Sequence, residues 1–171
     1  SVRTTTYLYG MYSYVLDEGT YLNVFPKKMS KYILEDGDTF ALTEAGRLAY
    51  WLDKPVKIID LVGLNTKYTA KHRLTQEYFK EIDPDAIMIL IHLNFKGDKN
   101  VYWIKDREEG RKAMTLDKDK LHLYEADKAG QAMIETGQYL YDHWDEYDVF
   151  FVRFLRDSHL HLYAIKKDKH K

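Results

Sequence analysis

The chain has 171 residues, and its 26 Lys and Arg against 27 Asp and Glu give a formal net charge of −1. A duplex-binding domain normally carries a basic surplus, so this balance argues against nucleic acid as a partner. The absence of cysteine excludes disulfides, zinc–thiolate and iron–sulfur sites and thiol catalysis, while a chain of this length can bury a core without such staples.

The first half of the chain alternates between helical and strand patterns. Residues 1–22 are rich in Tyr and Thr without a clear period, and we predict an irregular segment there. Apolar residues then recur at helical spacing over residues 24–34, and a Glu-Asp-Gly-Asp turn follows at 35–38. The later elements predicted in this half are strands at 39–43, 56–61 and 86–93 and helices at 44–52 and 72–82. Apolar strands that alternate with helices are typical of a parallel βαβ sheet covered on both faces.

The second half has a less regular pattern. We predict a short strand at 101–104, a charged loop at 106–111, a strand at 121–124 and a helix at 126–144. Strands at 149–155 and 160–165 form a hairpin, and the basic residues 166–171 are expected to fray. The residues expected on the inner face of the last helix are Ala129, Ala132, Met133, Tyr139 and Leu140. The chain thus predicts one α/β domain over residues 1–171, with a mostly parallel, Rossmann-like sheet and a C-terminal antiparallel hairpin.

The common sequence motifs of enzyme active sites are largely missing from this sequence. No glycine-rich phosphate loop follows a predicted strand, and no serine lies in a nucleophile elbow, so we assign no cofactor and no catalytic residue. His159 and His161 are two apart on a strand and face one side, where a third ligand would allow a metal site. We favour the alternative, a solvent-facing side of the hairpin shared with Arg153 and Tyr163, and assign no metal.

Two acidic residues lie where a parallel sheet binds ligands. Glu44 follows the first predicted strand and Asp60 ends the second, and ligands of open α/β sheets bind outside the carboxyl ends of the strands. Carboxylates there suit acid–base work or the hydroxyls of a sugar. The structural alternative, which we favour, is that Glu44 stabilises the start of a helix and that Asp60 binds loop amides beside Gly63.

Tyrosine dominates the aromatic residues, with 15 Tyr against 7 Phe and 3 Trp. A tyrosine ring has an apolar face and a polar tip, which suits sugar rings and protein interfaces. The alternative, which we prefer for most of them, is that tyrosines line half-exposed sheet faces.

Residues 36–65 contain a more specific pattern. It consists of a Gly-Asp turn, a strand, an Ala-Gly helix that also carries a Tyr, and an Asp-Leu-Val-Gly-Leu-Asn string. The pattern resembles a segment in the extracytoplasmic C-terminal part of polytopic membrane glycosyltransferases of the GT-C type. These enzymes use polyprenyl-phosphate sugars and include arabinofuranosyltransferase-like and protein-mannosyltransferase-like proteins. The resemblance covers residues 20–93 and, loosely, 147–166, whereas residues 94–146 match no pattern we can name.

The glycines of this pattern have a physical role. Gly46 in the first turn lets its helix lie close to the preceding strand, and Tyr50 falls one turn later on the same face. Gly63 permits a positive φ after the strand, so that Asp60 and Asn65 meet across the turn. The residues we predict to line any ligand surface are Glu44, Tyr50, Asp60 and Asn65, with Gly46 and Gly63 shaping it.

The resemblance implies a place and an accessory role. The domain would lie on the extracytoplasmic, periplasmic face of the cytoplasmic membrane, after membrane helices that precede Ser1. In the family the catalytic acid lies in an early loop between membrane helices, so no catalytic role transfers to this chain. We therefore expect the domain to support sugar transfer from a lipid-phosphate donor to an envelope acceptor. Its partners would be the membrane-embedded part of the parent chain and an acceptor glycan.

Two alternatives stay open at this stage. The domain is a non-catalytic interaction or scaffold domain of a membrane protein, with tyrosines at its interface, or it is a stand-alone soluble α/β protein. A saccharide titration separates the first alternative from the accessory role, and a screen of hydrolase substrates tests the second.

Overall fold

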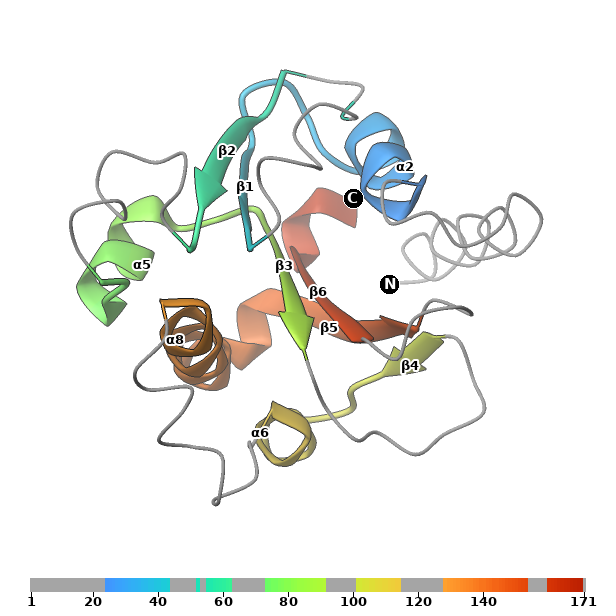
Figure 1. Ribbon diagram of the computed structural model, residues 1–171. Coiled ribbons are helices and arrows are strands. Elements are labelled where there is room, and N and C mark those ends of the chain that lie inside the picture. The colour runs from blue at the N-terminus through green and yellow to red at the C-terminus, as the bar shows by residue number, and fades with distance from the viewer. Residues whose placement is uncertain are drawn as a thin grey trace.

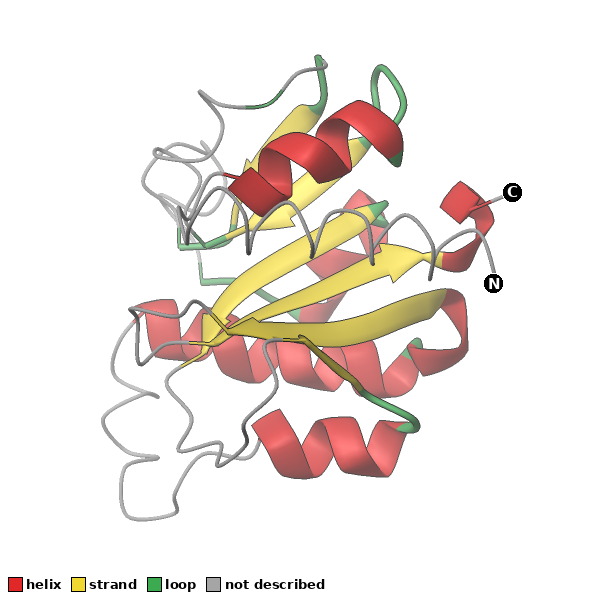
Figure 2. Ribbon diagram, turned by 90° about the vertical axis from the view of Figure 1, so that its right-hand side faces the viewer, coloured by secondary structure: helices red, strands yellow, loops and turns green. Residues whose placement is uncertain are grey.

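The computed structural model describes residues 24–43, 52, 55–62, 73–91, 101–114, 128–153 and 160–170. Within these residues six strands form one open sheet in the order β2-β1-β3-β6-β5-β4, and helices lie on both of its faces (Figure 1). In the view of Figure 2 the sheet is seen between these helices. Among the described helices none has the length and apolar character needed to span a bilayer.

The elements follow one another along the chain in a mixed order. The helices are α2 (Val24–Tyr32), α5 (Gln76–Ile82), α6 (Arg107–Met114) and α8 (Lys128–Asp142), and the 3-10 helices are η3 (Trp144–Glu146) and η4 (Lys167–His170). The strands are β1 (Thr39–Leu42), β2 (Lys57–Asp60), β3 (Ala86–Ile91), β4 (Val101–Trp103), β5 (Tyr147–Arg153) and β6 (Leu160–Lys166). The predicted irregular segment at 1–22, the predicted helix at 44–52 apart from Leu52, and the predicted strand at 121–124 lie outside the described residues.

The sheet has a parallel part and a larger antiparallel part. Strand β1 pairs in parallel with β2 and with β3, as the βαβ pattern predicts. The pairs β3–β6, β6–β5 and β5–β4 are antiparallel. The α/β class and the C-terminal hairpin β5–β6 are therefore confirmed. The mostly parallel, Rossmann-like sheet is not, because the hairpin docks directly on β3 and adds antiparallel pairs.

One face of the sheet carries the larger core. Alternate side chains of the central strands, such as Ile87, Leu162 and Ala164, pack against helices α5 and α8. Helix α8 contributes four of the inward residues that its periodicity predicts, Ala132, Met133, Tyr139 and Leu140, while the side chain of Ala129 lies outside what the structure describes. Phe79 of α5 stacks on Tyr139 of α8 with 4.5 Å between the ring centroids.

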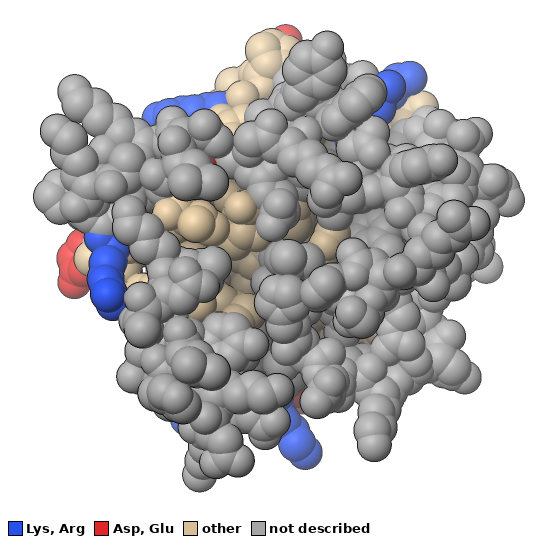
Figure 3. All heavy atoms as spheres, in the orientation of Figure 1, with Lys and Arg blue, Asp and Glu red and all other residues tan. Residues whose placement is uncertain are grey.

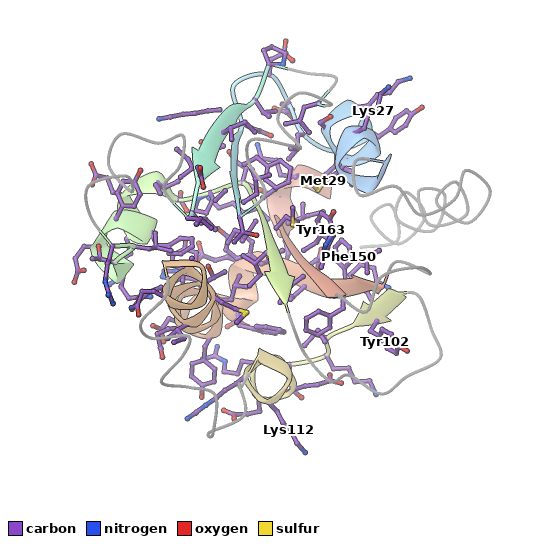
Figure 4. The ribbon with its side chains drawn as sticks, viewed as in Figure 1. Lys27, Met29, Tyr102, Lys112, Phe150 and Tyr163 are labelled. Carbon is purple, nitrogen blue, oxygen red and sulfur yellow. The ribbon has the colours of Figure 1, made fainter. Side chains whose placement is uncertain are left out.

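Helix α2 covers part of the opposite face. Met29, Ile33 and Leu34 pack there against strand residues that include Tyr163. Figure 4 shows Met29 between the helix and Tyr163, and the ring of Phe150 stacks on that of Tyr163 at 5.5 Å. The Pro-containing start of α2 and the turn after it, where Gly37 has a φ of 84°, agree with the predicted helix and turn.

Helix α6 corrects the charged loop predicted at residues 106–111. Its start forms reciprocal caps: the Asp106 carboxylate accepts from the Glu109 N–H at 2.9 Å, and Glu109 accepts from the Lys105 N–H at 2.7 Å. Acidic residues in the first turn and basic residues in the last complement the helix dipole. The charge cluster therefore encodes a surface helix.

Candidate functional site

Asp60 is the one predicted ligand residue that the structure describes. It ends β2, is buried, and its carboxylate accepts a hydrogen bond from the N–H of Val62 at 2.9 Å. This is the loop amide contact expected of the structural alternative. Its predicted companions lie outside the described residues: Glu44, Gly46, Tyr50, Gly63 and Asn65.

The register of the sheet places Asp60 at one end of a row of side chains. Directly paired residues of neighbouring strands point to the same face. The pairings join, in order across the sheet, Asp60, Leu42, Met88, Tyr163, Phe150 and Trp103. The row crosses the face that α2 covers and links a buried carboxylate on edge strand β2 to an aromatic ring on edge strand β4.

Trp103 is the most distinctive side chain at the surface of the described sheet. It exposes 40% of its surface, although large aromatic residues are usually buried. Its ring centroid lies 5.1 Å from that of Phe150, and the two planes are tilted by 48°. Phe150 is fully buried, so one side of the indole rests on fixed packing while another side faces solvent. Sequence reasoning predicted the strand but did not identify Trp103 as a surface residue.

The C-terminal hairpin does not expose the face that its histidine pattern suggested. His161 and Tyr163 are both fully buried, so the predicted solvent-facing side is wrong. The reason is that β6 lies inside the sheet between β3 and β5. His159 and Arg153 side chains lie outside what the structure describes. Within the described part, no three His, Asp or Glu side chains come together in a way that could hold a metal ion.

A buried ion-pair network closes the end of the sheet where β1 and β3 begin. Lys169 Nζ of η4 lies 2.7 Å from Asp38 and 3.6 Å from Asp85, and the Lys169 and Asp38 side chains are only 14% and 10% exposed. Burial acts to lower the pKa of Lys169, but the hydrogen bond to Asp38 and the neighbouring carboxylates outweigh it and raise that pKa. Residues 167–170 therefore form an anchored turn of helix, which corrects the expected frayed tail.

The carboxylates of this network also organise the backbone. Asp38 accepts from the Glu35 N–H at 2.8 Å, and Asp85 accepts from the Thr39 N–H at 2.8 Å. Lys166 pairs with Asp83 at 2.7 Å beside them. Such contacts fix the turns that lead into the strands, which is a structural use of charge.

A tyrosine pair lies on the α8 side of the sheet. The Tyr147 hydroxyl donates to the carbonyl of Pro84 at 2.5 Å and lies 3.4 Å from the Tyr139 hydroxyl. Burial raises the pKa of both phenols, which keeps them neutral hydrogen-bonding groups. At the surface beside them, His143 Nδ1 lies 2.5 Å from a carboxylate oxygen of Glu146. The imidazole ring of His143 stacks on the ring of Tyr139.

The chain was compared with protein families, curated proteins and solved structures. A family model described as "Domain of unknown function (DUF8728)" matches residues 16–163. The chain belongs to this family. No curated protein and no solved structure matches it.

The DUF8728 match includes both ends of the cross-strand row. Asp60 and Trp103 lie within residues 16–163, as do Asp38 and Asp85 of the ion-pair network. Lys169 lies beyond the matched region.

Proposed function

We propose that this DUF8728 chain is an extracytoplasmic accessory domain of a membrane glycosyltransferase-like protein. In this role it binds a saccharide and assists sugar transfer from a lipid-phosphate donor to an envelope acceptor, while the chemistry takes place in the membrane-embedded part of the parent protein. The resemblance of residues 36–65 to GT-C-type enzymes supports the setting. The exposed ring of Trp103 supports the binding of a sugar.

Trp103 is the observation that carries the proposal. An indole face offers a large, flat apolar surface on which a sugar ring can lie, and its two χ angles limit the entropy lost on binding. The contact with buried Phe150 holds the ring from behind. Tyr102, next to it on β4, points to the other face of the strand and is partly exposed.

The described carboxylates support a binding role over a catalytic one. Asp60 accepts from a loop amide, and Asp38 and Asp85 are tied to Lys169 and to backbone N–H groups. A general acid or base must be within hydrogen-bond reach of a reacting group. The contacts of these three carboxylates instead stabilise turns and the position of η4.

The sheet offers two separate places for a ligand. Trp103 lies on edge strand β4, and Asp60 lies on the opposite edge strand β2. Glu44, Tyr50 and Asn65, which the sequence predicts to accompany Asp60, lie outside the described residues. Five spacings of about 4.8 Å separate the two edges, a span of roughly 24 Å. A mono- or disaccharide thus contacts one edge only, and the proposal assigns it to Trp103.

A titration with envelope-type oligosaccharides, such as arabinan and mannan fragments, tests this function. The reporter is the indole N–H resonance of Trp103 in a nitrogen–proton correlation spectrum, assigned with Trp103→Phe. We expect this resonance to shift and Trp103→Ala to weaken binding at least about tenfold, equivalent to about 1.4 kcal/mol. Tyr32→Ala is the matched control, because Tyr32 on α2 is the other exposed large hydrophobic residue described.

Two results contradict the proposal. Either no envelope oligosaccharide shifts the Trp103 resonance, or Trp103→Ala binds as tightly as the unmodified chain.

The second candidate is a non-catalytic interaction or scaffold domain. The same residue favours it, since exposed tryptophans are frequent centres of protein interfaces. In that case saccharides do not shift the indole N–H resonance of Trp103. The substitution Trp103→Ala instead weakens association with the membrane-embedded part of the parent protein.

A further inference from the structure

The outward side of helix α2 is basic and aromatic. The helix, Val24–Tyr32, contains Lys27, Lys28 and Lys31 and no acidic residue. Lys27 and Lys31 are one turn apart, and both are exposed. Tyr32 exposes 48% of its surface, and the ammonium of Lys31 lies 5.3 Å from the centroid of its ring.

The inward side of α2 fixes the direction of these side chains. Met29 of α2 and Ile33, which follows the helix, are buried against the sheet, so the helix cannot rotate without breaking that core. Figure 4 shows Lys27 pointing away from the sheet, on the side of the helix opposite to Met29. In Figure 3, in the same orientation, blue Lys and Arg atoms protrude at the upper right over α2.

We propose that the outward side of α2, formed by Lys27, Lys31 and Tyr32, is a contact surface for an anionic phospholipid bilayer. Lysine ammoniums attract anionic headgroups, and tyrosine rings are enriched at the level of the headgroups. The local charge is a departure from the chain as a whole, which has a net charge of −1. Because the apolar side of α2 is used in the core, the helix lies on the headgroups and does not insert.

The positive charge of this surface is complementary to an anionic lipid surface and not to an apolar groove of a protein. Two exposed lysines beside a half-exposed ring present little apolar area, so a hydrophobic partner gains little there. Glu35 and Asp36 follow the helix and are exposed, so the basic charge does not continue along the chain immediately after α2. The inference stands on α2 and does not depend on saccharide binding at Trp103.

Co-sedimentation with vesicles tests this surface on the 171-residue chain. The vesicles contain three parts phosphatidylcholine to one part phosphatidylglycerol, and vesicles of phosphatidylcholine alone serve for comparison. We expect binding to the anionic vesicles only, and its loss at high salt as the Debye length falls. Each basic residue near an anionic surface strengthens binding about fivefold, so Lys27→Gln with Lys31→Gln should weaken it about 25-fold.

The matched control is Lys105→Gln with Lys112→Gln. These lysines are also exposed, and their replacement changes the net charge by the same amount. Lys112, which belongs to α6, lies far from Lys27 of α2 (Figure 4). This pair should leave vesicle binding within about twofold. Glutamine at four exposed positions preserves the fold, which circular dichroism verifies.

Three outcomes overturn the inference. The first is that the chain does not sediment with anionic vesicles, and the second is that both lysine pairs weaken binding equally. The third is that the chain binds a soluble polyanion such as heparin through α2 but ignores the vesicles. In each case the saccharide titration at Trp103 is unaffected, so the two proposals fail separately.

Discussion

Gly110 lies in the middle of α6, where most helices would favour alanine. A Cβ built at Gly110 would lie 2.6 Å from two atoms of the Trp144 ring and 3.4 Å from Ile104. Ordinary carbon contacts begin near 3.4 Å, so a bulky and almost fully buried indole would have to move by about 0.8 Å. The missing side chain therefore lets α6 pack directly on Trp144, the first residue of η3.

We expect Gly110→Ala to destabilise the domain in spite of its better helix propensity. Alanine gains up to about 1 kcal/mol over glycine in a helix interior. Overpacking of a filled core costs typically about 1–3 kcal/mol. Because the contact is with a buried aromatic ring of the core, we place the net loss at about 1–2 kcal/mol, or roughly 2–8 °C in Tm for a chain of this size.

Urea unfolding followed by circular dichroism measures this change. The matched background is Trp144→Phe, which shortens the ring at the two contacting atoms, so Gly110→Ala should cost less there or become favourable. A Gly110→Ala protein as stable as the unmodified chain, or more stable, would refute the close packing of α6 against Trp144.

Three further predictions concern the buried polar groups. Lys169→Met should lower the free energy of unfolding by about 2–3 kcal/mol in urea, because it leaves the Asp38 carboxylate buried without its cation. Asp60→Ala should cost about 1–2 kcal/mol and Asp60→Asn much less, since the amide keeps an acceptor; equal losses would contradict the turn role. Burial raises the pKa of Tyr147 and Tyr163, so the stability they give is complete below about pH 10 and is lost above it. A Tyr163→Phe chain whose stability falls as steeply above about pH 10 as that of the unmodified chain would contradict this.

Local patterns in the sequence predicted most of the described strands and the helices α2, α5 and α8, but neither α6 and η4 nor the full pairing of the strands. The apolar run of β3 and the helical period of α8 follow directly from residue spacing, because one face of each element must be buried. The docking of the hairpin on β3 depends on contacts between residues far apart, such as Met88 and Tyr163. No local period encodes that choice, so the antiparallel pairs β3–β6 and β4–β5 were missed, although the hairpin β5–β6 was predicted.

The polar features show the same division. The Asp60 contact with Val62 spans two residues and was foreseen from the turn that follows the strand. The pair of Lys169 and Asp38 joins residues 131 apart, and a basic chain end gives no sign of its partner. The exposure of Trp103 depends on β4 being an edge strand, which only the strand order reveals.

The two proposals place their surfaces on the same side of the sheet, and this gives a further test. Trp103 belongs to the cross-strand row on the face that α2 covers. If a bilayer contacts Lys27 and Lys31 on α2, Trp103 therefore lies on the face of the sheet that is turned toward the bilayer. A sugar held there would be on the side of the lipid-linked donor. In a Trp51→Phe chain, where Trp103 is exposed and Trp144 is buried, anionic vesicles should reduce acrylamide quenching of the fluorescence. Unchanged quenching with vesicle-bound protein would show that Trp103 points away from the bilayer, and saccharide binding would then have no direct connection with the membrane surface.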